Sequence, residues 1–123
     1  MDKIEFLILK NLIHNEDFMR KVVPFVKADY FEDSDQRVVY EEIFNFVSQY
    51  NESPTIEVLN IEVQKRKDLN ETSIRKVSQI IDCLDDSPVE FDWLVDTTEK
   101  WCRDRAIYLA LIESIQIADG QND

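Results

Sequence analysis

The scarcity of glycine constrains the fold more than any other feature of this sequence. The 123 residues include one glycine, Gly120, and three prolines, Pro24, Pro54 and Pro88. Tight β-hairpin turns need positive φ angles, which glycine adopts without steric cost. A chain with so little glycine is therefore expected to be helical. It also lacks the glycine-rich loop that lets a backbone approach a nucleotide phosphate closely.

Composition indicates one folded, acidic domain. A chain of 123 residues can bury a hydrophobic core, and 44% apolar residues exclude intrinsic disorder despite 33% charged residues. The formal net charge of −12 would repel phosphate backbones, so we expect no direct nucleic-acid binding. Basic residues gather at one place only, which we interpret as a solvated helix end: Lys65, Arg66 and Lys67, followed by Arg75 and Lys76.

Apolar periodicity and capping residues predict an all-α fold, with about five short helices followed by a long one. Apolar side chains recur at spacings of three and four throughout the chain. Ser, Thr, Asp and Asn side chains accept hydrogen bonds from the first free N–H groups of a helix, so they mark its start. The predicted helices are 2–14, one after Asn15, 34–50 behind Asp33 or Ser34, 55–66 behind Thr55, one from Asn70 to about 84, and 88–118 with Pro88 in its first turn.

The last predicted helix is too long and too apolar for a small globular body. At 1.5 Å per residue, its roughly thirty residues would run about 45 Å. A compact globule of this chain length is only about 35 Å across, so the helix should project beyond it. Its second half, residues 106–118, reads AIYLALIESIQIA and places apolar side chains on more than one face.

Two interpretations account for this surplus of apolar residues. The helix could lie at the centre of the core with neighbours all round, or it could be an arm that meets a partner helix, later in a longer chain or in another subunit. We prefer the arm, because the surplus lies at the C-terminus and chain ends are usually surface features. The candidate subunit or partner contacts along it are Trp101, Tyr108, Leu109, Ile112 and Ile115.

No group of residues in the sequence indicates catalysis. His14 is the only histidine, and at a helix end we expect it to cap carbonyl groups. No acidic pair has calcium-loop spacing, and Cys83 and Cys102 have neither metal nor redox spacing. We expect both thiols to be reduced in a cytoplasm, and the apolar run 6–9 is too short for a secretion signal or membrane span. We therefore predict no catalytic, metal or cofactor site in this chain.

A series of short segments resembles the N-terminal domain of DnaB-type replicative DNA helicases. The features shared with the family are Phe6-Leu7-Ile8-Leu9, Ala28-Asp29-Tyr30-Phe31, Ile43-Phe44, and Pro54-Thr55 with Leu59. The T-even phage branch is indicated by Asp86-Ser87-Pro88, Trp93-Leu94-Val95, Thr98-Glu99-Lys100 and Arg105-Ala106. Each segment is short, but their order and spacing extend over nearly the whole chain.

The resemblance implies an assembly, or collar, domain in the cytoplasm of an infected cell. Residues 1–87 would form the helical body, and 88–123 the first arm of a hairpin that ends near its tip. Such domains self-associate as dimers, and as hexamers in the full-length parent, and they dock primase. ATP and Mg would belong to a separate motor domain of the 5′–3′ DNA helicase. The sequence lacks the family's Gly-Gly turn after the fourth helix, so no primase-docking positions are transferred to it.

Two alternatives belong to other functional classes. The chain could be a free-standing acidic helical regulator of phage or bacterial origin that binds a host protein. A stop codon directly after Asp123 would favour that regulator, whereas a P-loop domain encoded there would favour the helicase. The fourth and fifth helices, with the basic cluster, could also form a helix-turn-helix DNA-binding motif. Salt-sensitive DNA binding by this chain would be needed to support that motif.

Overall fold

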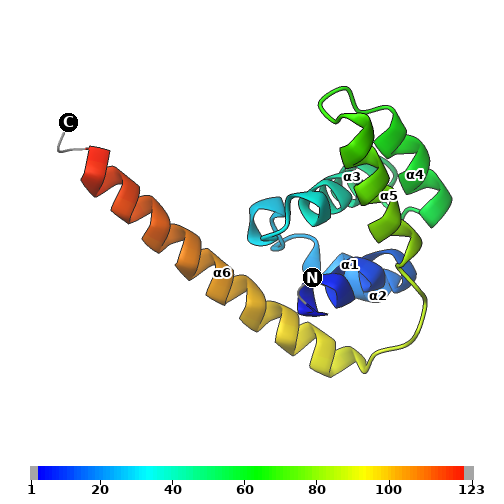
Figure 1. Cartoon of the computed structure of the whole chain (residues 1–123). Coiled ribbons are helices and arrows are strands. Elements are labelled where there is room, and N and C mark those ends of the chain that lie inside the picture. The colour runs from blue at the N-terminus through cyan, green and yellow to red at the C-terminus, as the bar shows by residue number, and fades with distance from the viewer. Residues whose placement is uncertain (1–2, 121–123) are drawn as a thin grey trace.

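The computed structural model describes residues 3–120, and side-chain surroundings for residues 3–118. The described residues form helices joined by loops, without a strand, which confirms the all-α prediction. A body of shorter helices is followed by one long helix that extends away from it (Figure 1). The elements are α1 (Lys3–His14), α2 (Glu16–Val22), the 3₁₀ turn η1 (Ala28–Tyr30), α3 (Ser34–Tyr50), α4 (Ile56–Gln64), α5 (Glu71–Asp82) and α6 (Phe91–Gly120).

Four helices begin at the capping residues that the sequence predicts. The Asn15 side chain accepts a hydrogen bond from the Phe18 backbone N–H, and Asp33 caps α3 in the same way. Thr55 and Asn70 cap α4 and α5. Each cap satisfies an N–H group that has no partner within its helix, which typically contributes about 1 kcal/mol. The first residue of the predicted first helix, Asp2, lies outside the described residues.

The core of the body is built around α1 and α3. Helix α1 packs against α2, α3 and α6, while α3 also packs against α4, α5 and η1. Phe31, just after η1, is fully buried and stacks on Tyr40 of α3 with 5.2 Å between ring centroids. The Tyr40 hydroxyl donates to the Val26 carbonyl at 2.7 Å, so this buried polar atom has a partner.

Polar contacts from α1 hold the loop between α5 and α6. The Lys10 ammonium is buried, and it donates to the Asp85 carboxylate at 3.2 Å and to the Ser87 hydroxyl. His14 Nε2 lies 2.8 Å from the Leu84 carbonyl oxygen. The expected role of His14 at a carbonyl is therefore found, but the carbonyl lies 70 residues away rather than in its own helix.

Helix α6 begins three residues later than the sequence predicts. Pro88 lies in the preceding loop, and the first helical residue is Phe91. The Glu90 carboxylate accepts hydrogen bonds from the Asp92 and Trp93 backbone N–H groups at 3.3 and 2.6 Å, so Glu90 supplies the cap that fixes this start. At 1.5 Å per residue, the 30 residues of α6 span about 45 Å. The expected projection beyond the body is therefore found (Figure 1).

Candidate interaction surface

Arg105 marks the point where α6 leaves the body. Before it, Leu94, Thr98 and Trp101 are buried against the body, where α6 packs on α1, α2 and η1. The Arg105 guanidinium donates to the Tyr30 carbonyl at 2.6 Å and to the Glu32 carboxylate at 3.2 Å. Among the described side chains, those after Arg105 are exposed or only half-buried. We call residues 106–118 the arm.

The arm carries a row of large apolar side chains in solvent. Ile107, Tyr108, Leu111 and Ile115 are between 52% and 60% exposed. Their spacing places them on one side of the helix, because neighbours at three or four positions lie one turn apart. Ile117, which is 53% exposed, lies on another side. We call the first four residues the apolar row.

The structure divides the five predicted contact residues into three groups. Tyr108 and Ile115 belong to the apolar row, and Leu109 and Ile112 are half-buried on the arm. Trp101 is 8% exposed, because its indole lies 5.0 Å from the Phe31 ring and 6.0 Å from the Tyr30 ring, measured between centroids. Its side chain therefore already has partners inside the body.

Four large apolar residues that are exposed on α6 were not among those predicted contacts. Ile107 and Leu111 complete the apolar row, Ile117 lies on another side of the arm, and Trp93 is 50% exposed near the start of the helix. The signal for Ile107 and Leu111 was present in the sequence, as apolar residues four apart in the arm. The signal for Trp93 was not, because its exposure depends on which side of α6 the body covers.

The base of the arm contacts Arg105, the last residue of α6 that the body holds, through the ring of Tyr108. The Arg105 guanidinium carbon lies 5.1 Å from the centre of the Tyr108 ring, within the range of a cation–π interaction. Arg105 is itself fixed by hydrogen bonds to Tyr30 and Glu32, so it positions the Tyr108 ring at the base of the arm.

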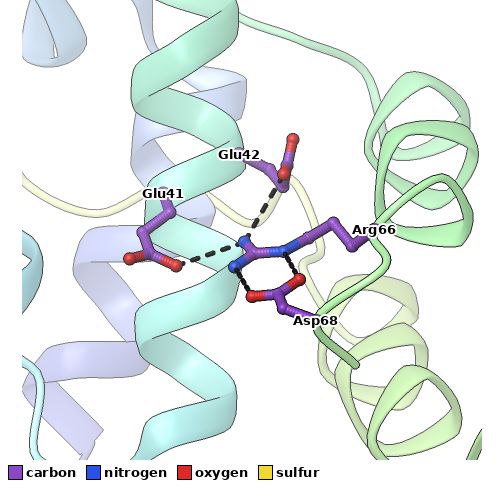
Figure 2. A network of polar contacts seen from close by, with 4 residues as sticks. All are labelled: Glu41, Glu42, Arg66 and Asp68. Atoms are coloured by element: carbon purple, nitrogen blue, oxygen red, sulfur yellow. Dashed lines mark hydrogen bonds and ion pairs between the residues drawn. The ribbon is translucent and has the colours of Figure 1, made fainter. Parts of the chain in front are cut away.

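The basic cluster contains an ion-pair network (Figure 2). Arg66 donates to both carboxylate oxygens of Asp68, at 3.0 and 2.7 Å, and to Glu41 and Glu42 of α3 at 3.1 and 3.5 Å. Its side chain is 19% exposed, so it is not the solvated helix end that the sequence indicated. Lys65 pairs with Glu62 at 3.1 Å. A guanidinium held by three carboxylates is a poor contact for a nucleic-acid phosphate.

The network shifts the pKa values of its members in different directions. The hydrogen bonds to Asp68, and then those to Glu41, hold the pKa of Arg66 above its usual value. The Arg66 contact in turn lowers the pKa of Asp68. Burial raises the pKa of Glu42, and Arg66 offsets only part of that rise. Only the contacts with Glu41 and Glu42 join the α4–α5 loop to α3, because Arg66 and Asp68 both belong to the loop.

A groove of about 690 Å³ opens beside this network. Pro24, Tyr40 and Phe44 line its apolar part, and Glu41 and Glu42 line its polar part. Phe44 is 43% exposed, so the groove could accept an apolar side chain.

In the described part of the chain, no three His, Cys, Asp or Glu side chains gather as metal ligands. None of the described helices has the length and apolar character that crossing a bilayer needs.

Comparison with known proteins identifies a relative. No family model matches the chain. A DnaB-like replicative helicase of Enterobacteria phage T4 is 32% identical over 111 residues, which cover 90% of this chain. The chain is related to the N-terminal domain of T4-type helicases. The resemblance to DnaB-type helicases of the T-even branch is thereby confirmed. The chain spans 23% of the length of the T4 helicase.

Proposed function

We propose that this domain assembles the subunits of a replicative helicase into a collar. The observation that carries the proposal is the apolar row on a helix that leaves its own body, in a chain related to the T4 helicase. In this proposal, residues 1–87 are the body and 88–123 the first arm of a helical hairpin. Burying the row against another subunit is the assembly step.

The free energy available from the apolar row favours a weak pair that a ring would strengthen. Fully burying one large apolar side chain stabilises by roughly 1.5–3 kcal/mol, so a half-exposed one has about 1 kcal/mol left to gain. Four such side chains from each of two copies give on the order of 8 kcal/mol. Lost translational and rotational freedom costs roughly 4–15 kcal/mol, so a pair should be weak on its own. A ring closes several such contacts at once, which raises their combined strength.

We propose that the same layer docks primase. This follows from the resemblance, and no face of the domain is assigned to the partner. ATP and Mg would act in a motor domain with a P-loop, which is absent from these 123 residues. We expect the domain to work in the cytoplasm of an infected cell without binding nucleic acid directly. The relationship with the T4 helicase favours this role over a free-standing regulator that binds a host protein.

One experiment tests both parts of the proposal. Tyr108→Glu combined with Ile112→Glu places two carboxylates on the arm, where they should dissociate the assembly without unfolding the body. Ala110→Glu with Gln116→Glu is the matched control, because it adds the same charge to the same segment without replacing a large apolar side chain. Light scattering should show a dimer or larger species for the unaltered chain and for the control at several hundred micromolar, and a monomer for the first variant.

A pull-down against the cognate primase then tests docking with the same three proteins. If primase binds the assembled layer, the unaltered chain and the control should retain it and the monomeric variant should lose most of it. A strictly monomeric unaltered chain at several hundred micromolar would contradict the assembly function. Assembly without any primase retention would contradict the docking function alone.

A further inference from the structure

A second pattern on α6 runs along the side that faces away from the body. Its residues follow one another at spacings of four, three, four, three and four: Trp93, Thr97, Lys100, Asp104, Ile107 and Leu111. Alternation of three and four is the spacing of a seam along which two helices pack. Thr97 is half-buried and the other five are exposed. We call these six residues the outer seam.

Charged residues occupy the middle of the outer seam, and apolar residues lie toward its ends. Lys100 and Asp104 form an ion pair 3.0 Å long within the helix, and their side chains are 71% and 62% exposed. Trp93 lies on one side of them, with Ile107 and Leu111 on the other. A charged residue at a seam position costs stability, but it selects the alignment in which its charge is paired.

We propose that the outer seam binds the outer seam of a second copy in the antiparallel direction, with a two-fold axis at the level of Cys102. This inference rests on the self-association proposed above and specifies its geometry. Residues equally far before and after Cys102 face each other in this arrangement. Lys100 faces Asp104 of the second copy, and the reverse pair follows by symmetry. In the same register, Trp93 faces Leu111 of the second copy and Thr97 faces its Ile107.

The charges distinguish this arrangement from the parallel one. In a parallel pair in register, Lys100 would face Lys100 and Asp104 would face Asp104, and like charges in contact oppose association. The antiparallel pair turns both repulsions into attractions. It also places the base of each arm, residues 106–111, along residues 93–98 of the partner's α6, the part that is backed by the body, so the exposed face of Trp93 is covered.

Area and geometry are compatible with a dimer of this kind. Trp93, Ile107, Tyr108 and Leu111 are each at least 50% exposed. With roughly 100 Å² from each, two copies would bury about 800 Å² of apolar surface, which is in the range of a weak interface. Leu94, Thr98 and Trp101, which face the body, lie on another side of α6. The two bodies would therefore lie on opposite sides of the helix pair.

Charge substitutions test the pairing. Lys100→Glu alone and Asp104→Lys alone each create two like-charge contacts in the antiparallel dimer, so each should weaken association by about tenfold or more. An equimolar mixture of the two variants should recover the affinity of the unaltered chain, because every contact in the mixed dimer joins opposite charges. Both chains are acidic, so sedimentation measurements belong at about 0.15 M salt, where the screening length is roughly 8 Å.

Cysteine cross-linking tests the direction. In a Cys83→Ser background, Thr97→Cys and Ile107→Cys are prepared as separate proteins, and one carries a tag that changes its size. Position 97 lies about 15 Å along the axis from position 97 of the second copy, which is too far for a disulfide. We therefore expect a disulfide only in the mixture of the two proteins, between chains of different size.

Each outcome decides between the two proposals. Cross-linking restricted to the mixture, with affinity recovered on mixing the charge variants, supports the antiparallel seam. A dimer in which each single-cysteine protein cross-links to itself is parallel, and it overturns the seam while self-association stands. A dimer that forms no disulfide, in the mixture or in the separate proteins, uses another surface. It likewise overturns the seam while self-association stands. A chain that remains monomeric at several hundred micromolar overturns self-association, and the seam with it.

Discussion

The burial of Trp101 leads to a quantitative prediction that separates the body from the arm. Trp101→Ala removes a side chain that is 8% exposed and packs on the rings of Phe31 and Tyr30. Replacing a buried Trp by Ala costs about 3–5 kcal/mol, of which the two ring contacts account for roughly 1–3 kcal/mol. Tyr108→Ala, seven positions further along α6, removes a side chain that is half in solvent and should change the stability by less than about 0.5 kcal/mol.

The assay is urea unfolding of both variants, followed by far-ultraviolet circular dichroism at low micromolar concentration. At this concentration the proposed pair is dissociated, so the free energy of unfolding is that of the monomer. With a denaturant dependence of about 2 kcal/mol per molar urea, Trp101→Ala should lower the midpoint by about 2 M, and Tyr108→Ala should leave it nearly unchanged. Equal midpoints for Trp101→Ala and the unaltered chain would refute the assignment of Trp101 to the core.

Two further predictions follow from perturbed side chains. Burial raises the pKa of the Cys102 thiol to about 12, so only about 10⁻⁴ of this thiol is ionised at pH 8. Ellman's reagent, which reacts with thiolates, should therefore label the exposed Cys83 at once and Cys102 only on unfolding. Hydrogen bonds to Ser87 and then Lys10 hold the pKa of Asp85 below its ordinary 3.8. That stability is present above pH 3.8 and is lost as the pH falls through the folded-state pKa, so Asp85→Asn should flatten the loss of stability as the pH falls below 3.8.

The starts of the body helices could be predicted because capping is a local interaction. Asn15 and Asn70 each accept from the backbone N–H group three residues further on, and Thr55 does the same. Donor and acceptor lie within one turn, so the sequence contains both. The predicted start of α6 was wrong for a related reason, because another local cap decides it. Pro88 suits a first helical turn, but the helix starts only where the Glu90 carboxylate accepts hydrogen bonds from the Asp92 and Trp93 N–H groups.

The Arg66 network could not be predicted because its members come from distant parts of the chain. Glu41 and Glu42 lie 25 and 24 residues before Arg66, and nothing in the sequence indicates that the α4–α5 loop returns to α3. Read along the chain, Lys65, Arg66 and Lys67 form a run of three cations. In the folded domain the middle one is neutralised, which removes much of the basis for a helix-turn-helix contact with DNA.

The boundary of the candidate surface depends on where the body ends, which periodicity does not encode. Trp101, Tyr108 and Ile115 are spaced by seven residues, so they lie along the same side of α6 and look equivalent in the sequence. The body covers this side as far as η1, where the Tyr30 carbonyl holds Arg105. Trp101 lies before that point and becomes core, whereas Tyr108 and Ile115 lie beyond it and remain in solvent. One apolar stripe thus has two environments, and its second part stays exposed because the body is shorter than its last helix.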